Sequence, residues 1–135
     1  MSIRRFLKAW LPTLFWAIII FSFSSKTTPT TSAVYWQDFV VKKTAHLFVY
    51  AVLSVLIYRS LKLTTGYKRL YLLLFTLTLT ILYAITDEFH QSFTFGREPT
   101  IRDVIIDIIG GTAGLSAFLK LNLPQLPQRH ARKKN

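Results

Sequence analysis

The sequence predicts an all-α polytopic membrane protein, with four transmembrane helices in a small bundle and both termini cytoplasmic. Half of the residues, 51%, are hydrophobic while the net charge is +11, and a soluble domain with one apolar core does not normally combine these properties. Four apolar segments are separated by short polar loops, and Lys and Arg are concentrated in alternate loops. These observations are typical of a chain that crosses a bilayer several times.

Composition excludes several other classes of protein. The chain has no cysteine, which excludes disulfides, thiolate metal sites and a cysteine nucleophile. Its basic residues are interrupted by long apolar segments and form no stripe with interleaved aromatics, so the lipid bilayer and not nucleic acid is the expected partner. We find no phosphate-binding loop, nucleophile elbow or His-Glu-x-x-His motif, and we therefore expect no metal and no cofactor.

The first apolar segment runs from Ala9 to Phe23, and the second from Thr44 to Tyr58. A basic start before an apolar segment also describes a signal peptide, but the segment is long for one and no Ala-x-Ala cleavage site follows. The second segment is short for a span. It becomes adequate if its helix begins upstream and includes Lys43 and His46 in its outer turns.

The third and fourth apolar segments, Leu70 to Thr86 and Val104 to Leu121, enclose the most polar part of the chain. We expect residues 87–103 to form a polar hairpin whose two ends reach hydrocarbon depth, where ionisable groups usually mark function. The bundle then occupies residues 1–123, and residues 124–135 form a basic tail that we expect to be disordered.

Orientation follows from the distribution of charge. Twelve of the 17 Lys and Arg residues lie on the side that holds both termini and the loop around Gly66. The positive-inside rule therefore places this side in the cytoplasm and the hairpin 87–103 outside.

Polar residues three, four or seven positions apart share one face of a helix, and three of the predicted helices carry such a stripe. If the stripes are buried against one another, they form a shallow pocket roofed by the hairpin. The stripes are Lys43, His46 and Tyr50 on the second helix, Thr76, Thr80, Tyr83 and Asp87 on the third, and Asp103, Asp107, Gly110 and Gly114 on the fourth.

The pocket offers cations that could hold an anionic head group, beside carboxylates and a histidine that could transfer protons. Asp107 lies about one turn deeper than Asp103, where an aspartate costs up to about 2.5 to 3.5 kcal/mol, so it requires Lys43, His46, Arg97 or a proton as partner. Our candidate catalytic residues are Glu88, Asp87, His46 and Asp103, and our candidate ligand-binding residues are Lys43, Tyr50, His90, Gln91, Arg97 and Asp107.

Each element also has a structural explanation. Gly110 and Gly114 form a Gly-x-x-x-Gly pair that is typical of close helix packing. Lys43 can extend to the membrane surface, and His46 can be a histidine whose hydrogen bonds are satisfied inside the bundle. Asp107 can belong to a structural ion pair.

The combination of these motifs resembles the signature of VanZ-like membrane proteins. Two positions differ from the usual pattern, with Phe95 where a proline is common and Asp107 where many relatives have Asn. The resemblance implies a small protein of the bacterial cytoplasmic membrane, in a family named for a teicoplanin-resistance protein. The matching residues are Ser24-Ser25, Lys43-x-x-His46-x-x-x-Tyr50, Asp87-Glu88-x-His90-Gln91-x-Phe93-x-x-Gly96-Arg97 and Asp103-x-x-x-Asp107-x-x-Gly110-x-x-x-Gly114.

Three functions fit these residues. The first is an envelope protein whose outward pocket binds, and in one version modifies, an anionic lipid-linked or amphiphilic molecule. The second is a proton-coupled transporter or flippase in which Asp107 and His46 relay protons. The third is a non-catalytic module whose hairpin docks another envelope protein.

Overall fold

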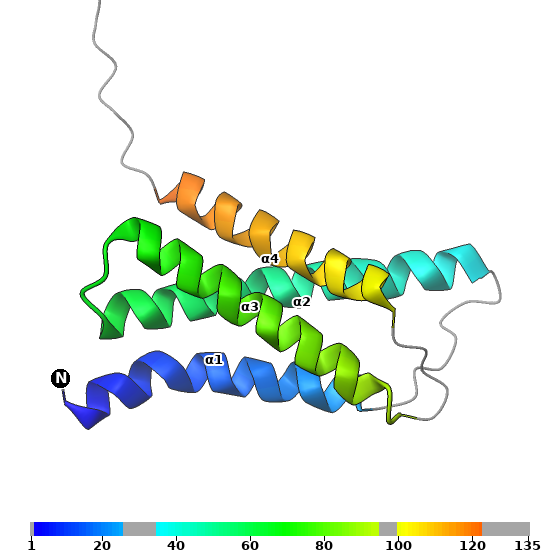
Figure 1. Cartoon of the computed structure of the whole chain (residues 1–135), viewed down its shortest axis with the longest axis horizontal. Coiled ribbons are helices and arrows are strands. Elements are labelled where there is room, and N and C mark those ends of the chain that lie inside the picture. The colour runs from blue at the N-terminus through cyan, green and yellow to red at the C-terminus, as the bar shows by residue number, and fades with distance from the viewer. Residues whose placement is uncertain (1, 26–34, 95–99, 123–135) are drawn as a thin grey trace, which may run out of the picture.

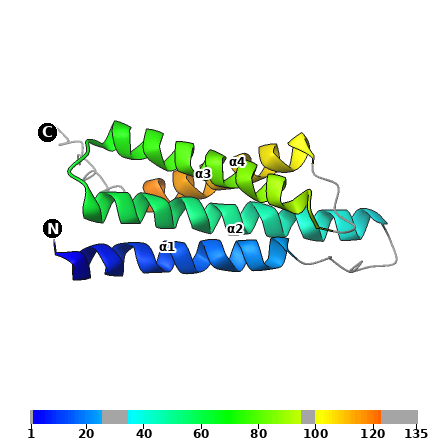
Figure 2. The same ribbon diagram turned by 60° about the horizontal axis from the view of Figure 1, so that its bottom comes forward.

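The computed structural model describes residues 2–25, 35–94 and 100–122. Four helices run alternately up and down and form one bundle (Figure 1, Figure 2). They are α1 (Ile3–Ser24), α2 (Tyr35–Thr64), α3 (Arg69–Gln91) and α4 (Ile101–Leu121). All four are long and apolar enough to cross a membrane, and the described residues contain no strand, so the predicted all-α bundle of four candidate spans is confirmed.

The helices extend beyond the apolar segments that predicted them. α2 begins at Tyr35, so Lys43 and His46 lie inside it, as the short second segment indicated. α3 continues to Gln91, which makes Asp87 helical and not part of a hairpin. α4 begins at Ile101 and is capped by Thr100, whose hydroxyl accepts a hydrogen bond from the amide of Asp103 at 3.3 Å. Apolar segments end at charged residues, but a helix continues where those residues find partners.

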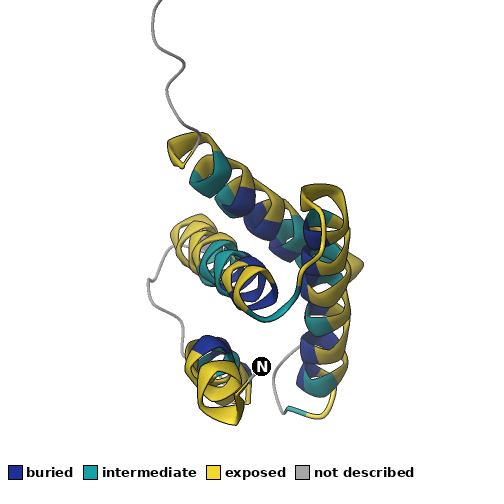
Figure 3. Ribbon diagram, turned by 90° about the vertical axis from the view of Figure 1, so that its left-hand side faces the viewer, coloured by how far each residue is buried: buried dark blue, intermediate teal, exposed yellow. Residues whose placement is uncertain are grey.

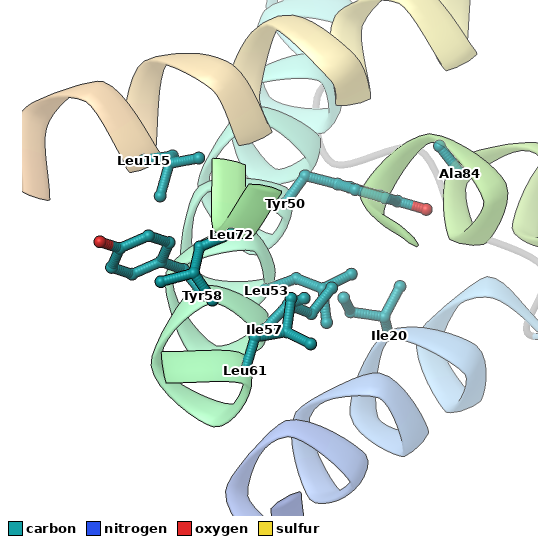
Figure 4. Close-up of a cluster of buried hydrophobic side chains, with 9 residues drawn as sticks. All are labelled: Ile20, Tyr50, Leu53, Ile57, Tyr58, Leu61, Leu72, Ala84 and Leu115. Atoms are coloured by element: carbon teal, nitrogen blue, oxygen red, sulfur yellow. The ribbon is translucent and has the colours of Figure 1, made fainter. Parts of the chain in front are cut away.

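α2 is the central helix. It packs against α1, α3 and α4, whereas α1 packs against α2 and only briefly against α3. Figure 3 shows α1 standing apart from α4, with α2 and α3 between them. The apolar core lies where these helices meet and includes Leu53 and Ile57 of α2, Ile20 of α1 and Leu115 of α4 (Figure 4).

α2 and α4 approach each other closely through two glycines. A Cβ atom at Gly110 would lie 2.5 Å from the carbonyl oxygen of Leu47, and one at Gly114 would lie 2.5 Å from Cα of Ala51. Real side chains do not fit at these distances. The Gly-x-x-x-Gly pair therefore serves helix packing, as its spacing indicated.

The outside of the bundle is apolar. Leu14, Phe15 and Ile18 of α1 are 55–66% exposed, and comparable side chains cover the outer faces of α3 and α4. Figure 3 shows the buried residues turned inward and the exposed ones outward on every helix. Exposed apolar surface on this scale is typical of contact with lipid.

The two ends of the bundle differ in charge. One end, called the basic end below, holds no Asp or Glu within the described ranges. The other, called the polar end, holds Asp87, Glu88, Asp103 and Asp107 together with Lys42, Lys43 and Arg102. The basic end carries Arg4, Arg5, Lys8, Arg59, Lys62, Lys68, Arg69 and Lys120.

Candidate functional site

Nine of the ten candidate site residues lie at the polar end, on three helices. The tenth, Arg97, lies outside the described residues, as does the basic tail. The nine are Lys43, His46 and Tyr50 of α2, Asp87, Glu88, His90 and Gln91 of α3, and Asp103 and Asp107 of α4.

His46 and Asp107 form the deepest polar contact of this end. Nδ1 of His46 lies 2.9 Å from Oδ1 of Asp107, whose side chain is completely buried. Oδ2 of Asp107 has no hydrogen-bond partner among the described residues. His46 is therefore the partner that a buried Asp107 required, and the contact leaves Nε2 of the imidazole for a second partner.

One turn closer to the surface, Nζ of Lys43 pairs with Oδ1 of Asp103. The pair is largely buried, with 17% and 14% of the two side chains exposed. Arg102 approaches the same oxygen at 3.9 Å, and both cations lie over the ring of Phe39, at 5.5 Å for Nζ of Lys43 and 5.1 Å for Cζ of Arg102. The Lys43–Asp103 ion pair and the His46–Asp107 hydrogen bond thus join α2 to α4 at successive turns.

Asp87 and Glu88 have different surroundings although they are adjacent. Oε1 of Glu88 accepts a hydrogen bond from the backbone amide of Thr100 at 2.6 Å, which ties the end of α3 to the start of α4. Oδ2 of Asp87 accepts one from Nε2 of Gln91 at 3.0 Å. Both carboxylates are buried, and within the described residues Oδ1 of Asp87 and Oε2 of Glu88 have no partner.

His90 and Tyr50 lie apart from these pairs. His90 stacks on Phe21 of α1, with ring centroids 4.2 Å apart, and its Nε2 lies 2.9 Å from the hydroxyl of Ser25. Its position holds α1 against α3. Tyr50 is completely buried and extends from α2 toward Ala84 of α3 (Figure 4), and its hydroxyl has no partner among the described residues.

A cavity of about 490 Å³ opens beside these groups, between α1 and α2. Its volume falls within the usual range for small-molecule sites. One part of its wall is polar and the other is apolar. The polar wall contains Lys42, Lys43, His46, Asp87, Gln91 and Asp103, and the apolar wall contains Trp16, Ile19, Ile20, Phe23 and Val49.

The sequence did not predict the apolar wall. Trp16, Ile19, Ile20 and Phe23 are spaced so that they share one face of α1, but the opposite face is equally apolar and faces lipid. A hydrogen bond of 2.9 Å from Nε1 of Trp16 to the carbonyl of Val49 joins the two sides of the wall. The spacing was visible in the sequence, whereas the partner of that face was not.

In the described part of the chain, no three His, Asp or Glu side chains gather as metal ligands. No arrangement of side chains there supports metal binding. The groups that line the cavity can form hydrogen bonds and ion pairs, and His46 with Asp107 can accept or donate a proton.

Together, the fold and the site define a polytopic membrane protein with a partly polar cavity at one end of its helices. The chain belongs to the VanZ/LLP1 family, whose sequence pattern matches residues 3–122. This confirms the resemblance found in the sequence. Comparisons with curated proteins and with solved structures found no match.

Proposed function

We propose that the protein binds an amphiphilic molecule of the cell envelope, with its head at the polar wall of the cavity and its apolar chain between α1 and α2. One observation carries the proposal: a single cavity has a polar wall of both charges and an apolar wall, and these are the two surfaces that an amphiphile presents. A ligand without apolar surface would gain nothing from Trp16, Ile19 and Phe23.

The apolar wall also provides a route of entry. Phe23 is 69% exposed, so the cavity is not closed on that side, and α1 packs only briefly against α3. An acyl or isoprenoid chain would enter from the surrounding lipid without crossing a polar surface. Burial of its methylene groups against Ile19, Ile20 and Val49 would stabilise the complex by about 0.8 kcal/mol per group.

The polar wall suggests the chemistry of the head. The cations of this wall are Lys42 and Lys43, which would attract an anionic group such as a phosphate or carboxylate that Lys43 shares with its partner Asp103. Asp87 also lines this wall, and a carboxylate accepts hydrogen bonds, so it favours a hydroxyl or amine donor on the same head. The ligand class is an anionic amphiphile that also carries hydrogen-bond donors, as lipid-linked envelope precursors do.

The proposal also includes the orientation of the protein in the membrane. The basic end would face the cytoplasm of a bacterium and the polar end the outside, by the positive-inside rule. Membership of the VanZ/LLP1 family adds a cellular readout, because VanZ-like proteins are named for teicoplanin resistance. Loss of binding would then change susceptibility to this glycopeptide.

A second candidate function is proton transfer to or from the bound head. It is favoured by the hydrogen bond between Nδ1 of His46 and Asp107, because an imidazole oriented in this way can act as a general base through Nε2. His46 lines the cavity, so a hydroxyl of the head could reach it.

Proton-coupled transport is less well supported. Between Tyr50 and the basic end, the interior is filled by apolar side chains such as Leu53, Ile57 and Leu115. The buried hydroxyls there bond to backbone carbonyls, as Ser54 does to Gly111 at 2.7 Å and Thr80 to Thr76 at 2.8 Å. The described residues therefore offer no polar path toward the basic end.

Native mass spectrometry tests the binding proposal. The Val49→Trp variant fills the cavity, and Phe48→Trp, on the neighbouring lipid-facing position, is its control. We expect wild type and Phe48→Trp to retain an amphiphile after extraction in mild detergent, and Val49→Trp to lose it. Equal retention by all three proteins would contradict binding in this cavity.

A further inference from the structure

A second cavity, of about 390 Å³, lies at the basic end between the start of α1 and the end of α2. Four of its lining side chains are cationic and come from both helices. The lining residues are Ser2, Arg4, Arg5, Lys8 and Ala9 of α1 and Arg59 and Leu63 of α2. We propose that this cavity binds the phosphate of an anionic lipid head group.

The first argument is charge. In the described part of the chain no carboxylate pairs with Arg4, Arg5, Lys8 or Arg59, and no acidic residue lies at this end. Four like charges around one cavity repel each other. An anion between them removes this repulsion and forms charge-assisted hydrogen bonds, which arginine makes to phosphate in bidentate geometry.

The second argument is the start of α1. Ser2 makes no side-chain capping hydrogen bond, and the first turn contains no acidic residue. The amino end of a helix carries partial positive charge, which favours anions and disfavours the cations Arg4 and Arg5. A phosphate at this position would accept hydrogen bonds from backbone amides of the first turn as well as from the arginines.

The third argument is preorganisation. Ser60, which is completely buried, donates a hydrogen bond of 2.8 Å to the carbonyl of Ala9 and shares one of 2.7 Å with the hydroxyl of Thr13. Nε1 of Trp10 donates to Thr64 at 3.3 Å. These contacts fix the spacing of α1 and α2 beside the cavity, so the cations need little rearrangement to bind.

The surroundings select a lipid as the source of the phosphate. Leu7 and Leu11, on the turns of α1 next to the cavity, are 48% and 56% exposed on the apolar outside of the bundle. A phosphate in the cavity would therefore lie at head-group depth, with its acyl chains along this apolar surface.

Native mass spectrometry in mixed micelles of phosphatidylglycerol and phosphatidylcholine tests the proposal. The cavity variant is R5Q/R59Q. The control is K62Q/K68Q, which removes the same charge from the same end but outside the cavity lining. Each protein also carries Val49→Trp, so that lipid at the polar end is not counted.

We expect the ratio of bound phosphatidylglycerol to phosphatidylcholine to fall about fivefold for each arginine removed from the cavity, and by clearly less in the control. R5K/R59K, which keeps the charges but loses the bidentate geometry of arginine, should lose less of the preference than R5Q/R59Q. Equal losses in the cavity variant and the control would overturn the proposal, because the effect would then belong to the basic surface as a whole. Displacement of the lipid by inorganic phosphate alone would also overturn it, in favour of a free anion.

Discussion

His46 and Asp107 face each other across the contact between α2 and α4, with Nδ1 of the imidazole 2.9 Å from Oδ1 of the carboxylate. The contact lies at the depth of Gly110, where the backbones of α2 and α4 approach closely. A Cβ atom at Gly110 would meet Leu47, the residue after His46. Close packing and the polar contact therefore depend on each other. Asp107 is held without exposure to lipid or water, and His46 is aimed at the cavity.

The first prediction concerns Asp107. Asp107→Asn keeps an oxygen that can accept a hydrogen bond from His46, so we expect a folded protein that still binds its amphiphile. Asp107→Leu leaves the imidazole without a partner. We expect it to lose about 1–3 kcal/mol of stability and to lose ligand binding as well. Thermal unfolding in detergent measures the stability of both. Equal behaviour of the two variants would contradict a positioning role for Asp107.

The second prediction separates two roles of Glu88. If its function is to accept the hydrogen bond from the Thr100 amide, Glu88→Gln keeps an accepting oxygen and should change stability and binding little. Glu88→Ala leaves that amide unsatisfied, and we expect a cost of about 1–3 kcal/mol. A Gln variant that is stable but inactive in a cell-based susceptibility assay would instead assign Glu88 a proton-transfer role.

The third prediction concerns helix packing. Gly114→Leu places a side chain where even Cβ would lie 2.5 Å from Ala51, so we expect a loss of about 3 kcal/mol or more, or a failure to fold. The control is Gly66→Ala in the loop between α2 and α3, where an added Cβ meets nothing within 4 Å. Expression level and thermal unfolding compare the two. A tolerated Gly114→Leu would show that α2 and α4 do not pack in this way.

The fourth prediction concerns orientation. The chain has no cysteine, so single cysteines can be introduced at Ser92, beside the polar end, and at Gly66, at the basic end. Both positions are exposed. In intact cells, a membrane-impermeable maleimide should label Ser92→Cys and leave Gly66→Cys unlabelled until the cells are lysed. The opposite pattern would reverse the proposed topology and place the cavity on the cytoplasmic side.

Much of this arrangement was predictable because hydrocarbon penalises charge. His46 and Asp107 stand inside apolar segments, so each needed a partner, and few partners were within reach. His46 was one of four partners considered for Asp107, and the structure selects it. Lys43 and Asp103, at the ends of their segments, could equally have extended into water, and the structure was needed to pair them.

Other features depend on tertiary contacts that spacing does not encode. His90 was grouped with the ligand-binding residues, but it packs on Phe21 of α1, a helix whose neighbours could not be deduced from its uniform apolar surface. The extension of α3 through Gln91 depends on partners such as the Thr100 amide. The apolar wall of the cavity was missed because a side chain that faces a ligand chain resembles one that faces lipid.

Photo-crosslinking from two neighbouring positions of α1 tests the central claim most directly. Benzoylphenylalanine replaces Ile19, which lines the cavity, or Ile18, which is 62% exposed at nearly the same depth. After irradiation in cells, mass spectrometry identifies what each position captured. We predict an anionic amphiphile enriched at Ile19 and only bulk lipid at Ile18. The same mixture of bulk lipids at both positions, or a protein partner at Ile19, would contradict the account.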